Sequence, residues 1–149
     1  MTGNCDAADP FRLERFVAAQ DTVYGQVVGE LRAGLKRTHW MWFVFPQIIG
    51  LGSSGTAVFY SIRSLDEARA YLAHPVLGPR LRDCTGIVTA LTETSAAAIF
   101  GDVDARKLRS SMTLFFHASG RGEPFHAAIA KFFGGMGDAE TEAILGLRP

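Results

Sequence analysis

Hydrophobic residues recur at helical spacing along most of the chain. The clearest run has steps of four, three, four and three positions, at Leu77, Leu81, Cys84, Val88 and Leu91, which lines one face of a helix. Similar patterns predict helices over residues 9–20, 22–33, 56–62, 64–72, 104–119, 125–133 and 138–145. No segment alternates with a period of two, and no Asn-Gly hairpin signal occurs. The pattern predicts an all-α fold, a compact bundle of about seven to eight short and medium helices.

Capping residues mark several of the expected helix ends. An Asp-Pro pair at residues 9–10 suits the N-cap and first position of the first helix. Residues 64–67 form a Ser-x-x-Glu capping box, and Ser95 suits the cap of a short helix that stops at Gly101. The segment 40–45 is apolar on every side, so its periodicity does not separate a buried helix from a buried strand.

Length and charge narrow the functional classes. The 149 residues suit one domain over residues 9–149, after a flexible leader at residues 1–8. Lys plus Arg and Asp plus Glu number 15 each, so no bulk field draws the chain to nucleic acid or to a membrane. Two cysteines are too few for a disulfide framework. The start does not resemble a signal peptide, so we expect a cytoplasmic protein. The oligomeric state stays open.

The densest group of chemically useful side chains runs from Lys36 to Trp42, with Gln47 just after it. The indole of Trp40 or Trp42 can stack on a nucleobase, while Lys36 can hold an anionic group. His39 can act as an acid, a base or a hydrogen-bond donor. The alternative is that both indoles are core aromatics and the cations lie at a solvated helix end.

A second candidate lies at the start of the expected helix 104–119. A helix N-terminus presents free N–H groups, and Lys107 and Ser111 lie four positions apart on one face. Together with Arg109 and Ser110, this turn could hold a phosphate or a carboxylate. The aspartates at its entrance would compete with an anion and are better explained as caps. Asp104 is alternatively a candidate catalytic carboxylate.

The first predicted helix contributes a third candidate. Gln20 falls on the apolar stripe and needs a partner, most simply another core group. Glu14 lies beside the stripe, where a raised pKa would suit a general acid or base, although an exposed glutamate is commoner. The four histidines have no metal-ligand spacing, so no metal is expected. The Gly/Ser segment at residues 50–55 lacks the ending of a P-loop and is typical of a flexible loop.

Longer blocks of the chain resemble the domain of unknown function 1810 family. They cover residues 9–20, 30–36, 38–47, 67–81 and 107–115, and the most distinctive are His-Trp-Met-Trp-Phe-Val-Phe-Pro-Gln and His-Pro-Val-Leu-Gly-Pro-Arg-Leu. The resemblance implies a small, mainly helical bacterial protein. The label calpastatin, which some members carry, has no support in these residues.

Two blocks of the chain also resemble blocks of the NADAR (YbiA-like) proteins, and they occur in the same order along the sequence. They are Glu14-Arg-Phe-Val-Ala-Ala-Gln20 and Ala73-His-Pro-Val-Leu-Gly-Pro-Arg-Leu81. This resemblance implies a helical protein that acts on N-glycosidic bonds of ribose derivatives such as ADP-ribosylated guanine, with Glu14 at the catalytic position. The chain departs from the NADAR pattern at Asp21, where those proteins have a lysine, and it lacks their terminal Asp-x-x-Trp-Gly.

The leading hypothesis is therefore a protein that binds a nucleotide- or ADP-ribose-like small molecule and, as an enzyme, hydrolyses an N-glycosidic bond without a cofactor. In this hypothesis Glu14 or Asp104 supplies the catalytic carboxylate, and Trp40 or Trp42 stacks on the base. Lys36 or Arg109 binds the phosphate, and Gln47 or His39 orients the ribose. The rival is a non-enzymatic binding or interaction module, because large aromatics also build interfaces. A common pocket for residues 36–47 and the 104–119 helix would favour the first.

Overall fold

The computed structural model describes residues 9–147. This part of the chain contains ten α-helices and no strand, and a single isolated parallel bridge joins Ile48 to Ile62. The all-α prediction is confirmed. The helices outnumber the expected seven to eight because several of them are only four to six residues long. The leader expected at residues 1–8 lies outside the described residues.

The helices follow one another with short connections. In chain order they are α2 (Glu14–Asp21), α3 (Tyr24–Ala33), α4 (Met41–Val44), α5 (Gly55–Phe59), α6 (Leu65–Ala73), α7 (Leu77–Ala90), α8 (Ala96–Phe100), α9 (Asp102–Ser119), α10 (Pro124–Phe133) and α11 (Ala139–Ile144).

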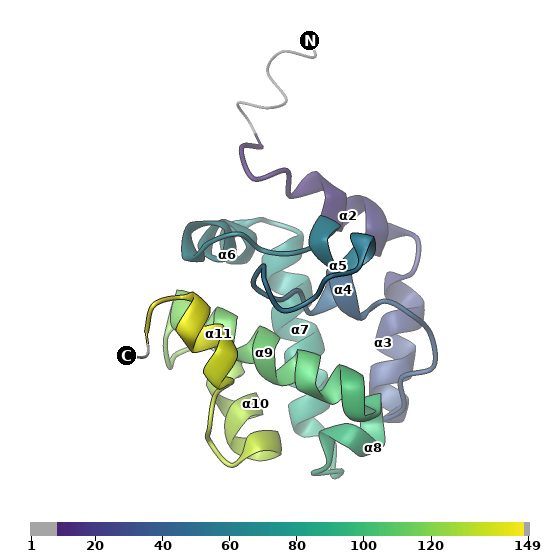
Figure 1. Ribbon diagram of the computed structural model, residues 1–149. Coiled ribbons are helices and arrows are strands. Elements are labelled where there is room, and N and C mark those ends of the chain that lie inside the picture. The colour runs from purple at the N-terminus through teal and green to yellow at the C-terminus, as the bar shows by residue number, and fades with distance from the viewer. Residues whose placement is uncertain (1–8, 148–149) are drawn as a thin grey trace.

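Two long helices, α7 and α9, lie in the middle of the molecule, and the others pack around them (Figure 1). Helix α9 contacts α6, α8, α10 and α11, while α7 contacts α3, α6 and α10. Large side chains from all parts of the chain, including Phe16, Tyr71, Phe115 and Phe125, are fully buried in the core between them. None of these helices is both long enough and apolar enough to cross a membrane.

Helices α2 and α9 begin at other residues than expected. Helix α2 starts at Glu14 because Asp9 acts from further upstream: its carboxylate accepts hydrogen bonds from the N–H groups of Leu13 (2.7 Å) and Glu14 (3.0 Å). Helix α9 starts at Asp102, with Gly101 at its N-cap and no side-chain cap. The interpretation of the aspartates at the entrance to α9 as caps is therefore wrong. Their negative charges still lie in the first turn, where they interact favourably with the positive end of the helix dipole.

The buried glutamine of α2 has core partners, as predicted. The side-chain amide of Gln20 donates to the carbonyl oxygen of Phe43 (2.6 Å) and to the hydroxyl of Tyr71 (3.0 Å). Its oxygen accepts a hydrogen bond from the guanidinium of Arg80 (3.4 Å). Gln20 therefore ties α2 to α4, α6 and α7, which accounts for a polar residue on the apolar stripe.

Candidate functional site

One buried carboxylate holds residues 36–42, which we call the Trp-rich segment, in place. Oε1 of Glu30 accepts hydrogen bonds from the N–H groups of Arg37 (2.8 Å) and Thr38 (3.1 Å) and from the indole of Trp40 (2.9 Å). Its Oε2 accepts the hydroxyl of Thr38 (2.7 Å). Glu30 is 8% exposed, so these donors replace the water that it loses on folding. The path of the chain from α3 to α4 is therefore fixed by Glu30.

The pKa of Glu30 reflects this arrangement. Burial by itself would raise the pKa, because it disfavours the charged form. Hydrogen bonds from Thr38, Arg37 and Trp40 outweigh burial and lower the pKa to about 2. The carboxylate is therefore ionised at neutral pH, and its role is to anchor the loop.

The two tryptophans of the segment have different surroundings. Trp40 is 1% exposed and packs against Phe45 and Phe100, with ring centroids 6.3 and 6.5 Å away. Its indole is part of the core and does not face a cavity. Trp42 is half-buried and lines a cavity beside α9. Only Trp42 is therefore placed where an indole could stack on a ligand.

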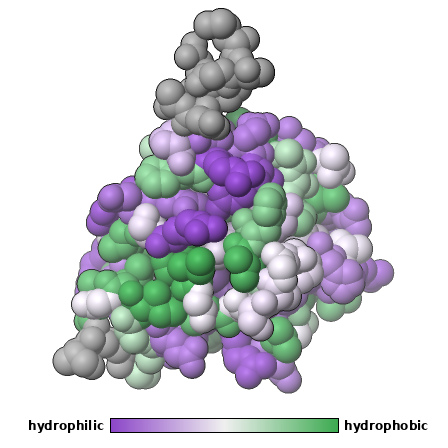
Figure 2. Space-filling model, turned by 45° about the horizontal axis from the view of Figure 1, so that its top comes forward, coloured by the Kyte–Doolittle hydropathy of each residue, from purple (hydrophilic) through white to green (hydrophobic). Residues whose placement is uncertain are grey.

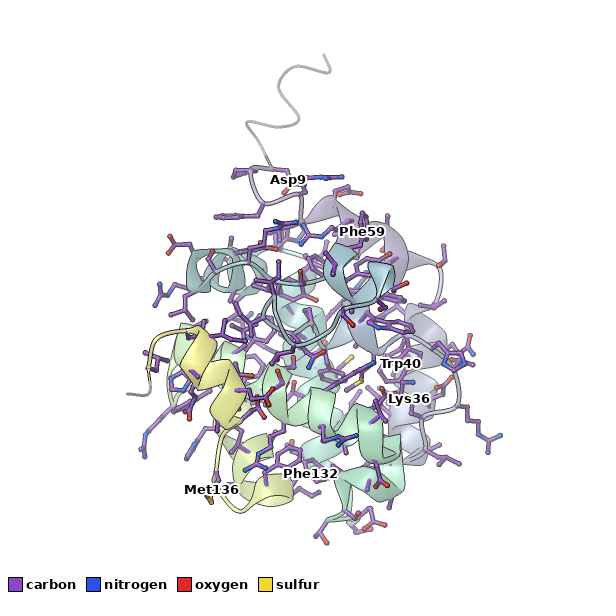
Figure 3. All side chains as sticks on the ribbon, viewed as in Figure 1. Asp9, Lys36, Trp40, Phe59, Phe132 and Met136 are labelled. Carbon is purple, nitrogen blue, oxygen red and sulfur yellow. The ribbon has the colours of Figure 1, made fainter. Side chains whose placement is uncertain are left out.

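An ion-pair cluster joins the Trp-rich segment to α9. Nζ of Lys36 lies 2.8 Å from Oδ2 of Asp104 and 5.1 Å from the ring centroid of Trp40, and Figure 3 shows Lys36 next to Trp40. Nζ of Lys107 lies 3.6 Å from the other oxygen of Asp104 and 4.9 Å from the ring centroid of Trp42. Asp104 thus holds two cations, and one of them, Lys107, lies over the half-buried indole of Trp42.

The cavity beside Trp42 has a volume of about 690 Å³, within the range of about 300–1,000 Å³ that is typical of small-molecule sites. We call it the Trp42 cavity. Its lining residues come from α4 and the loop after it, from α5, from α9 and from the start of α11. They are Trp42, Gln47, Leu51, Gly52, Ser53, Ser54, Ala57, Val103, Arg106, Lys107, Arg109, Ser110, Asp138 and Glu140. The lining includes three cations and two carboxylates.

Several polar groups of the Trp42 cavity have no partner in the part of the chain that the structure describes. Within residues 9–147, the indole N–H of Trp42 and the side-chain amide of Gln47 make no hydrogen bond. The same holds for the backbone N–H groups of residues 52–54. These donors can contact a molecule in the cavity, and Lys107, which also lines it, supplies a positive charge.

On the side of the cavity next to α11, several polar side chains are hydrogen-bonded to other parts of the protein. The hydroxyl groups of Ser110 and Thr141 lie 2.9 Å apart, and Oδ2 of Asp138 accepts hydrogen bonds from the N–H (2.9 Å) and hydroxyl (2.7 Å) of Thr141. Nε of Arg109 donates to the carbonyl oxygen of Met136 (3.0 Å). Ser110 and Arg109 therefore line the cavity but also hold the chain before α11 against α9.

The structure brings some of the predicted site residues together and separates others. Trp42, Gln47, Lys107, Arg109 and Ser110 all line the Trp42 cavity. The remaining candidates do not line it. They are Glu14, Lys36, His39, Trp40 and Asp104.

Glu14 and His39 lie on other parts of the surface. Glu14 is exposed on α2, where it borders a separate depression of about 370 Å³ that His74 also lines. His39 is exposed in the connection between α3 and α4. Neither residue lines the Trp42 cavity.

Sequence reasoning missed the loop after α4 and the neighbour of Lys107. Arg106, Asp138 and Glu140 also line the cavity, and no periodic pattern set them apart from other surface charges. The Gly/Ser composition of residues 50–55 was the available signal for the loop. A Cβ at Gly52 would lie 2.7 Å from the Cβ of Ala57, so the loop can approach α5 only with glycine there.

The described part of the chain contains no cluster of side chains suited to bind a metal ion. No group of three or more His, Cys, Asp or Glu side chains within residues 9–147 could hold an ion. The cavity is instead lined by hydroxyl, amide, indole and charged groups, which suit an organic ligand.

The fold and the Trp42 cavity define a small helical protein with an open cavity that is polar and partly aromatic. Residues 10–145 match the model of the family described as "Protein of unknown function (DUF1810)", and the chain belongs to that family. It is also similar to the crystal structure of the conserved hypothetical protein Rv1873 from Mycobacterium tuberculosis, with 56% identity and a TM-score of 0.91. That match covers 94% of this chain and 100% of the other. No curated protein matches the chain, and neither match carries the NADAR or calpastatin label.

Proposed function

We propose that the Trp42 cavity binds a small, flat, anionic molecule of the nucleotide class. The observation that carries this proposal is the convergence of Trp42, Gln47 and Lys107, from two distant segments, on one cavity of about 690 Å³. A nucleotide needs a surface for stacking, polar groups for the sugar, and cations for the phosphate. Each of these is represented in the cavity.

The geometry of Lys107 supports binding of an anion. Its Nζ is 3.6 Å from Asp104, longer than an ordinary hydrogen bond, so this contact is a weak ion pair. Asp104 keeps the shorter contact, 2.8 Å, with Lys36. A phosphate in the cavity can therefore draw Lys107 away without leaving Asp104 unpaired. Arg106 is exposed on the same helix and makes no ion pair within residues 9–147, so it offers a second cation.

Hydrolysis of an N-glycosidic bond is the enzymatic form of this proposal. It requires a carboxylate in the cavity, to activate water or to stabilise the oxocarbenium-like transition state. Asp104 does not line the cavity and is held by two cations, and Glu14 borders a different depression. Of the two carboxylates in the cavity, Asp138 caps α11, whereas Glu140 is exposed and makes no hydrogen bond with the rest of residues 9–147. Glu140 is therefore the residue that we assign to this role.

Calorimetry with AMP, ADP-ribose and NAD at millimolar concentration tests the binding proposal. We expect at least one of them to bind, and Trp42→Ala and Lys107→Ala each to weaken binding by about tenfold, which corresponds to about 1.4 kcal/mol. Arg121→Ala is the matched control, because this exposed arginine follows α9 and does not line the cavity. The proposal fails if none of the three binds to the folded protein, or if the variants bind as tightly as the parent chain.

The enzymatic form has its own test. The ligand that binds best is incubated with the protein, and the released base and ribose product are separated by chromatography. Glu140→Gln should abolish release but leave binding within about twofold. Binding without release would favour the rival, a non-enzymatic binding module.

A further inference from the structure

A second cavity lies on the other side of α5. Ser54 and Ala57 face the Trp42 cavity, whereas Gly55, Val58 and Phe59 line a depression of about 680 Å³ between α2, α5 and the start of α6. We call it the Phe59 pocket. It does not share a lining residue with the Trp42 cavity. Any ligand of the Phe59 pocket is therefore separate from the ligand proposed above.

The floor of the Phe59 pocket is apolar and open to solvent. Phe59 is 49% exposed and Val58 is 40% exposed, and both are among the most exposed large hydrophobic residues of the described chain. Phe11 borders them from the segment before α2. Phe59 lies at the same end of the molecule as Asp9 (Figure 3). In Figure 2, which brings this end forward, hydrophobic and strongly hydrophilic residues lie directly against one another.

Three arginines line the pocket, and among the contacts within residues 9–147 only the side chain of Arg15 is paired. The guanidinium of Arg15 donates to the carbonyl oxygens of Phe59 and Ser61, both at 3.0 Å, and to Oε2 of Glu67 at 2.8 Å. This ion pair neutralises both charges. The side chains of Arg12 and Arg63 make no hydrogen bond or ion pair within residues 9–147. Within the described part of the chain, the pocket therefore has two unpaired guanidinium groups beside an exposed aromatic surface.

The backbone at Arg12 adds an independent observation. Arg12 has φ 55°, and no other non-glycine residue in the described chain has a positive φ. This left-handed conformation disfavours a residue with a Cβ, and glycine would adopt it freely. The conformation is held by the Arg12 N–H, which donates to the carbonyl oxygen of Asp9 (3.0 Å), and by the carboxylate of Asp9. A cation is thus held at the pocket at a cost in backbone energy, a pattern that gathers at binding sites.

We propose that the Phe59 pocket binds a phosphate monoester with an apolar, preferably aromatic, body. The head group would lie between Arg12 and Arg63, because guanidinium groups form paired hydrogen bonds with phosphate oxygens. The body would cover Phe59 and Val58, which removes their apolar surface from water. Two free cations match the two negative charges of the head group.

The test measures binding of phenyl phosphate, inorganic phosphate and phenol to the full chain. Backbone amide NMR detects the binding of each probe. We expect phenyl phosphate to shift amide signals of α5 and of residues 11–15, and to bind at least tenfold more tightly than either fragment. Arg12→Gly and Arg63→Ala should each weaken binding about tenfold. Arg69→Ala is the control, since this exposed arginine of α6 pairs with Asp66 and lies outside the pocket.

Two further readouts separate this site from its alternatives. Binding should survive Lys107→Ala; if that variant abolishes it, phenyl phosphate occupies the Trp42 cavity and the present proposal is wrong. Arg12→Gly should raise the melting temperature while it weakens binding, a combination that a purely structural role of Arg12 would not produce. The absence of α5 shifts, or full binding by both arginine variants, would also overturn the proposal.

Discussion

Replacement of Glu30 by glutamine tests how the Trp-rich segment is held. In the native chain, one carboxylate accepts four hydrogen bonds, from two backbone N–H groups, a hydroxyl and an indole. Glutamine presents one oxygen and one NH₂ group, so at least one of these donors would face another donor. We expect Glu30→Gln to fold, but with a much lower free energy of unfolding.

The magnitude follows from the pKa. Hydrogen bonding lowers the pKa of Glu30 from an ordinary value of 4.5 to about 2, which corresponds to about 3 kcal/mol of stability at pH 7. Because the pKa in the folded state is the lower one, this contribution is complete above the unfolded pKa near 4.5. It is lost as the pH falls toward 2, and by linkage about 1 kcal/mol remains at pH 3.

Urea unfolding at pH 7, 5 and 3, monitored by circular dichroism, measures the effect. The difference between the parent chain and Glu30→Gln should be about 3 kcal/mol at pH 7 and pH 5, and should shrink by about 2 kcal/mol at pH 3. Glu14→Gln is the control: its carboxylate is exposed, and we expect a change of about 0.5 kcal/mol or less. A difference for Glu30→Gln that does not vary with pH would refute the assigned role of the charged carboxylate.

Three further predictions concern packing, backbone strain and thiol chemistry. Gly78→Ala should lower the free energy of unfolding by more than about 2 kcal/mol, because the new Cβ would lie 2.1 Å from a backbone oxygen of α6. Gly86→Ala, in the same helix but with open space around it, should instead raise the free energy of unfolding by up to about 1 kcal/mol. Urea unfolding of the two variants measures both changes. Arg12→Gly should stabilise the chain by about 0.5–1 kcal/mol by relieving its left-handed backbone, and an unchanged or lower melting temperature would contradict this. In a Cys5→Ser background, Cys84 should react with iodoacetamide at pH 8 at least about 100-fold more slowly in the native protein than in urea, because burial raises the pKa of its thiol to about 11; equal rates would exclude this.

Local signals in the sequence were enough to predict most of the helices. The spacing from Leu77 to Leu91 lies on α7, and Ser64 and Ser95 cap α6 and α8 through side-chain hydrogen bonds to Glu67 and Ala98. Such signals act within a few residues, so they do not depend on the rest of the fold. The start of α2 escaped them because the Asp9 carboxylate contacts N–H groups four and five residues away.

The candidate site was only partly accessible to the same reasoning. Trp40 and Trp42 are two residues apart and chemically identical, yet one is sealed in the core and the other lines a cavity. The difference depends on Glu30, ten residues before Trp40, which binds its indole. No local pattern contains that contact.

The amino-acid sequence by itself determined that this chain forms helices, where most of them begin and end, and to which family it belongs. Only the tertiary structure decided which of its aromatic and charged residues meet, because Trp42 and Lys107 are separated by more than sixty positions and come together through the packing of α9. The physical reason is one of range. Helix formation follows from neighbouring residues, whereas a cavity exists where distant elements fail to fill the space between them.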